Sequence, residues 1–110
     1  MKQRYETAVR QLHRSLRKVY GSNLKDVIVF GSVARDTDTA ESDVDVMIVL
    51  DGSAKPVDWR IEKDIRGVAF DIELKYGVVF DVKVIDARSL NKEKGHTPFV
   101  ERVFAEGVRP

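Results

Sequence analysis

Two aspartates stand at the start of a strongly apolar stretch, Asp43–Leu50. Side chains alternate along a strand, so Asp43 and Asp45 should point to the same face of a sheet, about 6–7 Å apart. Burying a carboxylate is costly unless it is paired or bound to a cation. The pattern therefore indicates a cation site, rather than packed core, on that side of the strand.

A third acid, Asp81, interrupts another apolar run, Val78–Ile85. Three carboxylates at one edge of a sheet would give an oxygen-rich site suited to Mg²⁺. Two such ions can clamp the attacking and leaving oxygens of a phosphoryl displacement. Asp81 taken alone could equally be an edge residue facing water.

A Gly-Ser pair, Gly31 and Ser32, directly follows the apolar run Val27–Phe30. Glycine lets the backbone come close to a phosphate, and the N–H groups that follow it favour negative charge. The hydroxyl of Ser32 adds a donor for a phosphate oxygen. Each feature alone is weak evidence, but together with the aspartates they imply a nucleoside triphosphate with magnesium. The sequence has no glycine-rich Walker motif.

The elements that would position these residues follow from apolar periodicity. Helical spacing predicts a first helix over residues 3–20 and a crossover helix that ends at Gly77. A short helix should start at Gly31, and a last one should run from Pro98 to Gly107. The strands are expected at the ranges Leu24–Phe30, Asp43–Leu50 and Val78–Ile85.

The resulting order is α-β-α-β-α-β-α, which predicts an α/β sheet covered by helices. Asp43–Leu50 is apolar on both faces beyond its first residues, so it should be the central strand. The polar segments 36–42 and 86–97 are predicted to be loops. Trp59, near the start of the crossover helix, is interpreted as a packing anchor that a nucleotide base could also use.

Length and composition limit the number of domains and the kinds of partner and chemistry to expect. The length of 110 residues predicts one domain, 1–110. Nineteen basic and eighteen acidic residues give no basic excess, so strong nucleic-acid binding is not expected. The absence of cysteine excludes disulfides and thiol chemistry. No signal peptide or membrane-spanning run is present, and a cytoplasmic location is expected.

The segment VFGSVARDTDTAESDVDVMIVL resembles the signature of the DNA polymerase β-like nucleotidyltransferase superfamily, and in particular its minimal nucleotidyltransferases. The resemblance covers nearly the whole chain and implies a small mixed sheet of about three strands flanked by helices. In such proteins the residues matching Asp43, Asp45 and Asp81 are catalytic and bind the metal, so the resemblance implies two Mg²⁺ ions. The implied reaction is the attack of an acceptor hydroxyl on the α-phosphate of ATP, which transfers AMP and releases pyrophosphate.

The same resemblance assigns the nucleotide-binding residues. Gly31 and Ser32 would hold the triphosphate, and Arg35 matches a frequent basic residue near the phosphates. Ser42 precedes Asp43 as in many members, where it supports the local geometry of the nucleotide site.

The acceptor is less well defined by the sequence. Minimal members are often antitoxins that transfer AMP to a tyrosine of a HEPN-domain ribonuclease toxin, so the resemblance implies a toxin partner and a hetero-oligomer. Two alternatives stay open. The chain could neutralise its partner by contact alone, or it could modify a small aminoglycoside-like substrate.

Overall fold

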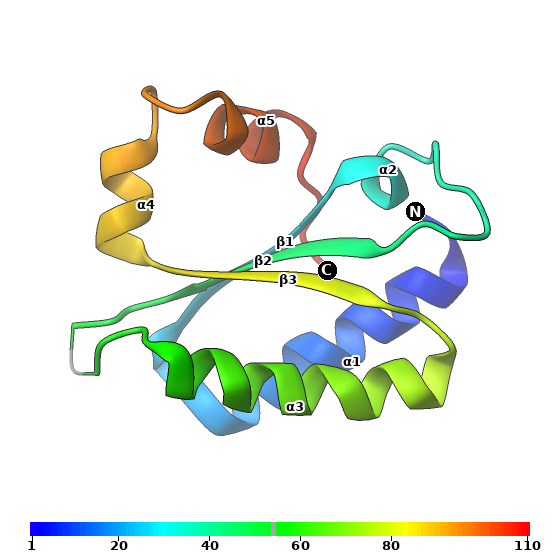
Figure 1. Cartoon of the computed structure of the whole chain (residues 1–110), viewed down its shortest axis with the longest axis horizontal. Helices are drawn as coiled ribbons and strands as arrows, with labels where there is room; N and C mark the ends of the chain where they lie inside the picture. The colour runs from blue at the N-terminus through cyan, green and yellow to red at the C-terminus, as the bar shows by residue number, and fades with distance from the viewer. Residues whose placement is uncertain (54) are drawn as a thin grey trace.

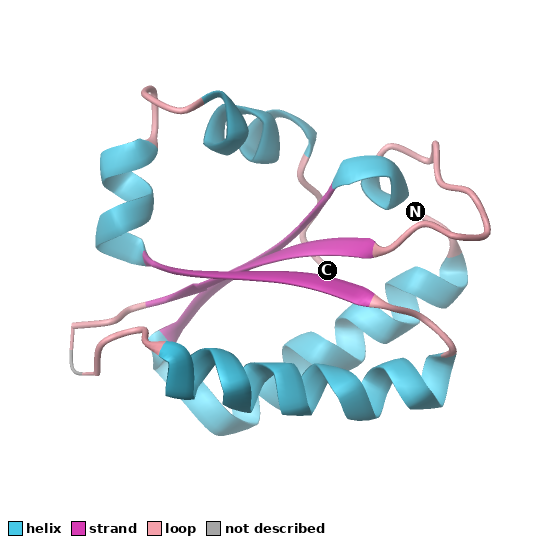
Figure 2. Cartoon of the chain, in the orientation of Figure 1, coloured by secondary structure: helices cyan, strands magenta, loops and turns pink. Residues whose placement is uncertain are grey.

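The central strand of the protein is β2 (Val44–Leu50), which lies between β1 (Leu24–Phe30) and β3 (Phe80–Asp86). β1 pairs with β2 antiparallel and β3 pairs with β2 parallel, so the sheet is mixed. The structure is a computed structural model that describes residues 1–53 and 55–110. The predicted central position of the second strand and the mixed three-stranded sheet are confirmed (Figure 2).

Helices cover both faces of this sheet (Figure 1). One face packs against two long helices, α1 (Gln3–Tyr20) and α3 (Trp59–Tyr76). The other packs against α4 (Ala87–Glu93) and α5 (Pro98–Glu106). A short helix, α2 (Gly31–Ala34), continues directly from the end of β1. A 3₁₀ turn, Gly21–Asn23, joins α1 to β1.

The two faces of β2 belong to two apolar clusters because its side chains alternate. Val46 and Ile48 face α1 and α3, and Met47 and Val49 face α4 and α5. Strands that are buried on both faces read as continuous apolar runs, which is why β2 shows no polar alternation after Asp45.

Helix α3 is capped at both ends, and it ends at Gly77 as the sequence predicts. The Asp58 side chain accepts hydrogen bonds from the backbone N–H groups of Arg60 and Ile61, at 3.0 and 3.3 Å. Gly77 ends the helix in the left-handed conformation, at φ 66°. No helix in the described part of the chain is long and apolar enough to cross a membrane.

One predicted loop is wrong. Within 86–97 the structure places helix α4, which the polar composition of the segment concealed. The Asp86 carboxylate caps it by accepting from the Ser89 N–H at 2.8 Å and from the Ser89 hydroxyl at 3.0 Å. A single buried residue, Leu90, fixes the helix to the sheet. The helix is therefore held by its N-cap, by Leu90 and by the partly buried Ala87, and these apolar residues are too few to show a helical period in the sequence.

The cap gives a first prediction. Asp86→Ala should lower the free energy of unfolding by about 1 kcal/mol, the usual loss for an N-cap, measured by urea denaturation at pH 7. Asp86→Asn keeps an acceptor oxygen and should lose only a few tenths of that.

The free energy of unfolding of the two variants should depend less on acid pH than that of the native chain. The Ser89 backbone N–H lowers the pKa of Asp86 below its ordinary value. The stabilisation from the charged cap is therefore complete above the ordinary aspartate pKa and is lost as pH falls through the lower folded-state pKa. The Asn variant should lack that contribution to acid destabilisation. A pH dependence identical to that of the native chain would contradict the role of Asp86.

Candidate active site

The register of the sheet brings Asp45 and Asp81 together. Asp45 lies opposite Phe30 on β1 and opposite Asp81 on β3. Both carboxylates line a cleft of about 400 Å³. Asp45 is half-buried, and the Asp81 side chain is 47% exposed at the free edge of the sheet. The two acids therefore form a pair at the end of the sheet where β2 and β3 begin, as the sequence predicted.

Gly31 makes room for the Asp45 carboxylate. It sits directly after the β1 residue that faces Asp45, and it adopts φ 75°, which L side chains rarely take. A Cβ atom at Gly31 would overlap Oδ2 of Asp45. The sequence interpretation assigned this glycine to close approach of a phosphate. In the structure, the absence of a side chain at Gly31 lets the Asp45 carboxylate come close to the backbone.

The remaining walls of the cleft come from α2, β3 and α5. The lining side chains and glycine are Phe30, Gly31, Ser32, Arg35, Asp45, Asp81, Lys83, Phe99, Arg102 and Val103. The sequence interpretation named five of them and missed the other five, which are Phe30, Lys83, Phe99, Arg102 and Val103. Lys83 lies two residues after Asp81 on β3, so strand alternation could have placed it on the same face.

No sequence pattern of this kind places Phe99 and Arg102 at the cleft. They are three residues apart, which puts them on one face of α5, but nothing in the sequence says that α5 closes this cleft. Helix α5 is held against the sheet by the buried Val100 and Val103, and an aromatic contact adds to this. Phe99 meets Phe30 edge-to-face, with ring centroids 5.5 Å apart.

The predicted nucleotide-binding residues are not all in the cleft. Ser32 and Arg35 line it, and Arg35 also forms an ion pair with Glu106 at 2.8 Å. Ser42 lies outside the lining, and its hydroxyl accepts the Thr39 N–H at 2.9 Å within the loop that precedes β2. Ser42 thus shapes the loop that leads to the aspartates.

The electrostatics of the cleft favour a bound cation. Partial burial raises the pKa of Asp45, and the neighbouring Asp81 carboxylate raises it further, with Asp43 adding to the effect. Lys83 opposes this shift and lies 3.5 Å from Asp81. A divalent cation held by these carboxylates would relieve their repulsion, and their hard oxygen donors fit Mg²⁺.

Asp43 is less closely associated with the pair. It is exposed, precedes the first residue of β2, and does not line the cleft. Within residues 1–53 and 55–110, no three acidic or histidine side chains are grouped closely enough to hold a metal ion. The structure therefore assembles two of the three predicted ligands and leaves the third at the rim, where its charge still acts on Asp45.

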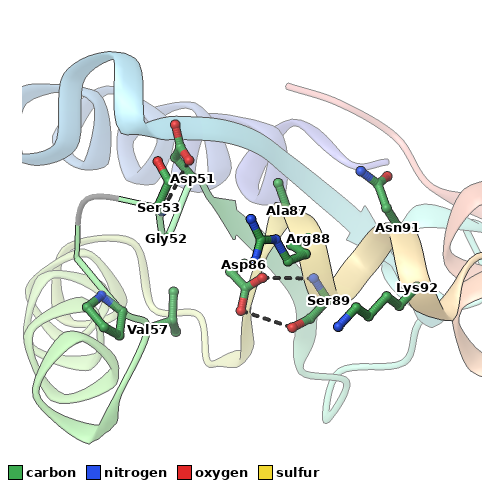
Figure 3. Close-up of a pocket in the computed structure, with 11 residues that line it drawn as sticks. Asp51, Gly52, Ser53, Val57, Asp86, Ala87, Arg88, Ser89, Asn91 and Lys92 are labelled. Atoms are coloured by element: carbon green, nitrogen blue, oxygen red, sulfur yellow. Dashed lines mark hydrogen bonds between the residues drawn. The ribbon is translucent and has the colours of Figure 1, made fainter.

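A larger cavity, of about 800 Å³, lies at the opposite ends of β2 and β3 (Figure 3). Its two acids already have partners. Asp51 accepts the Ser53 N–H at 3.2 Å, and Asp86 caps α4 through Ser89. Because these carboxylates serve turns and a helix end, the smaller cleft remains the candidate for chemistry.

Known proteins resemble this chain in sequence and in structure. Residues 9–109 match the family described as nucleotidyltransferase domain. A protein of Methanocaldococcus jannaschii, named as a candidate protein adenylyltransferase, is 33% identical over 102 residues, 93% of each chain.

Two solved structures extend the comparison. A candidate minimal nucleotidyltransferase superposes with a TM-score of 0.62 and 25% identity, over 100% of this chain and 97% of that one. A toxin–antitoxin structure with AMP-PNP gives a TM-score of 0.56 at 20% identity, over 89% of this chain and 68% of that one, and shows a shared fold.

The contact between Gly31 and Asp45 can be tested by a double-mutant cycle. Gly31→Ala should lower the free energy of unfolding by about 2 kcal/mol or more, from the left-handed backbone and the overlap together. In an Asp45→Ala background only the backbone cost should remain, about 1 kcal/mol. Urea denaturation of the four proteins measures the coupling, and additive effects would contradict the contact.

The carboxylate pair should weaken the fold when no cation is present. Because the pKa of Asp45 is raised, its charged form is disfavoured in the folded state, and Asp45→Asn should stabilise the protein above that pKa. We expect a Tm higher by about 2–4 °C at pH 8 in EDTA. Added Mg²⁺ should raise the Tm of the native chain more than that of the variant. A variant Tm at or below the native value in EDTA would contradict the repulsion.

Proposed function

The chain belongs to the nucleotidyltransferase domain family, and from that premise we propose that it transfers AMP from ATP to a hydroxyl of a partner protein. The observation that carries the proposal is the Asp45–Asp81 pair, which faces a cleft that also holds Gly31 and Ser32. The protein adenylyltransferase name of the archaeal relative supports the choice of nucleotide and of acceptor.

We assign the residues as follows, with the whole chain acting as one domain. Asp45 and Asp81 hold Mg²⁺, and Asp43 completes the ligand set from the rim. Gly31, Ser32 and Arg35 bind the triphosphate, and Ser42 keeps the intervening loop in place. Bound Mg²⁺, two ions in the full site, would supply charge neutralisation for the phosphates and the attacking oxygen.

The reaction is an in-line substitution at the α-phosphorus. The acceptor oxygen forms a bond to that phosphorus, the bond to the bridging oxygen of the β-phosphate breaks, and pyrophosphate leaves. The exposed Asp81 carboxylate at the open side of the cleft takes the proton of the acceptor hydroxyl. Lys83 and Arg102 also line the cleft and would offset the negative charge of the leaving group.

The partner that fits best is a toxin. A chain with this fold occurs in a toxin–antitoxin structure solved with AMP-PNP. Together with the family resemblance, this supports a HEPN-domain toxin as the acceptor and one of its tyrosines as the modified residue. The chain would then act as an antitoxin by covalent modification.

The test is transfer of radioactivity from α-³²P-labelled ATP to the protein encoded beside this chain, with Mg²⁺ present. Asp45→Asn and Asp81→Asn should each reduce labelling by about a hundredfold or more, the loss typical when one electrostatic contributor to the transition state is removed. Asp71→Asn, an exposed acid on α3, is the matched control and should label normally.

Two outcomes would overturn the proposal. Neutralisation of the partner that persists in Asp45→Asn without labelling would mean that contact alone does the work. Labelling of an aminoglycoside in place of the protein would identify a small-molecule acceptor.

A further inference from the structure

The outer edge of β3 carries unpaired backbone groups. Only β2 pairs with this strand in the described sheet, so the opposite edge is free. Phe80 shows which residues face outward: its N–H donates to the Glu73 carboxylate at 2.6 Å, and its C=O accepts from Arg66 at 2.9 Å. Because backbone groups alternate in direction, Val82 and Val84 also point their N–H and C=O groups outward. No hydrogen bond from the described residues reaches those four groups.

A groove runs beside this edge, between β3 and α3. It measures about 570 Å³ and is lined by Trp59, Glu62, Lys63, Arg66, Val82, Lys83 and Val84. Trp59 is 65% exposed, so the predicted packing anchor is wrong; the ring contacts the Arg60 guanidinium, 5.2 Å from its centroid. The groove therefore offers an uncovered aromatic ring next to an open strand edge.

The charge of the groove is positive. Three cations, Lys63, Arg66 and Lys83, outnumber one acid, Glu62. Arg66 is paired with Glu73 and Lys83 is paired with Asp81, whereas no ion pair within the described residues involves Lys63, so Lys63 is the cation that is open to an occupant. An occupant of this groove should therefore carry negative charge.

We propose that an extended acidic segment of the acceptor protein adds to β3 as a fourth strand, hydrogen-bonded to the outward groups of Val82 and Val84. This inference rests on the proposed function and identifies how the acceptor is recognised. Backbone hydrogen bonds give such strand addition its affinity, and pockets for alternate side chains give it specificity. The unpaired backbone groups favour a peptide over a nucleic acid, which could use the cations and Trp59 but not the strand edge.

Strand addition at this edge would also orient the acceptor. Side chains of the added strand that lie beside Val82 and Val84 would face the groove, and those beside Asp81 and Lys83 would face the cleft. The Glu73 and Arg66 side chains already occupy the backbone groups of Phe80, so the pairing ends next to Asp81. A hydroxyl-bearing side chain at that point lies at the open side of the cleft.

The chain contains one tryptophan, so Trp59 fluorescence reports on the groove without any catalysis. The probe is a short peptide of alternating threonine and glutamate with one central tyrosine, titrated without ATP. We expect a saturable change in Trp59 emission, and about tenfold weaker binding when lysine replaces glutamate in the peptide.

Backbone methylation of the peptide tests the strand pairing itself. Two versions are N-methylated at odd or at even positions, and only one set of N–H groups can face β3. One version should bind about tenfold more weakly and the other should bind nearly as well as the parent. Equal affinity of all three peptides, or no emission change with the parent, would overturn the proposal.

Two variants of the protein complete the test. Val84→Pro removes an outward N–H that the fold does not use, and Lys63→Glu reverses the free cation without touching the backbone. Each should weaken peptide binding by about tenfold, with circular dichroism unchanged. Native affinity in Lys63→Glu, or tighter binding of single-stranded oligonucleotide than of peptide, would contradict an acidic peptide as the occupant. Dimerisation that Val84→Pro abolishes would assign the edge to a second copy.

Asp45→Asn separates this proposal from the proposed function. It should bind the peptide with native affinity, because Asp45 lies outside the groove. Peptide binding without transfer to any partner by the native chain would leave the strand edge as a docking site and refute the transferase assignment. Transfer to a partner protein that is unaffected by Val84→Pro and Lys63→Glu would refute only the strand addition.

Discussion

The closeness of the Asp45 and Asp81 carboxylates is the constraint on which the rest of the site depends. Partial burial raises the pKa of Asp45, and the like charge of Asp81 beside it in the parallel pair raises that pKa further. The strands that impose the contact are held by apolar clusters on both faces of the sheet. The core thus supplies the free energy that keeps the two acids together.

The surrounding residues can be understood as supports for this pair. Gly31 leaves space for the Asp45 carboxylate, and its positive φ turns the chain into α2 at the edge of the cleft. Arg66 and Glu73 on α3 hold the backbone of Phe80, the residue before Asp81. Each aspartate therefore stands on a strand, with its surroundings set by residues of α2 or α3, so its position does not depend on a loop.

Much of this arrangement follows from sequence patterns, and the exceptions have physical reasons. Long amphipathic helices, apolar strands and the Gly31–Asp45 segment were recognisable, and the family matches confirm the resemblance. The missed helix α4 depends on a cap and one buried leucine, which leave too short a period to detect. Phe99 and Arg102 could not be assigned because the docking of α5 is a tertiary contact. Asp43 obeys strand alternation in sequence but lies just before the strand begins.

The mixed topology of the sheet also determines when the site can form. Gly31 and Asp45 meet through an antiparallel pair with a short connection, so their contact is local in sequence. Asp81 reaches Asp45 only after the α3 crossover has packed against the sheet. A chain that has formed only the β1–β2 pair therefore has a carboxylate and a glycine in place but no acid pair. The acid pair therefore forms only when β3 joins β2, so a partly folded or nascent chain that lacks this pairing also lacks the proposed active site.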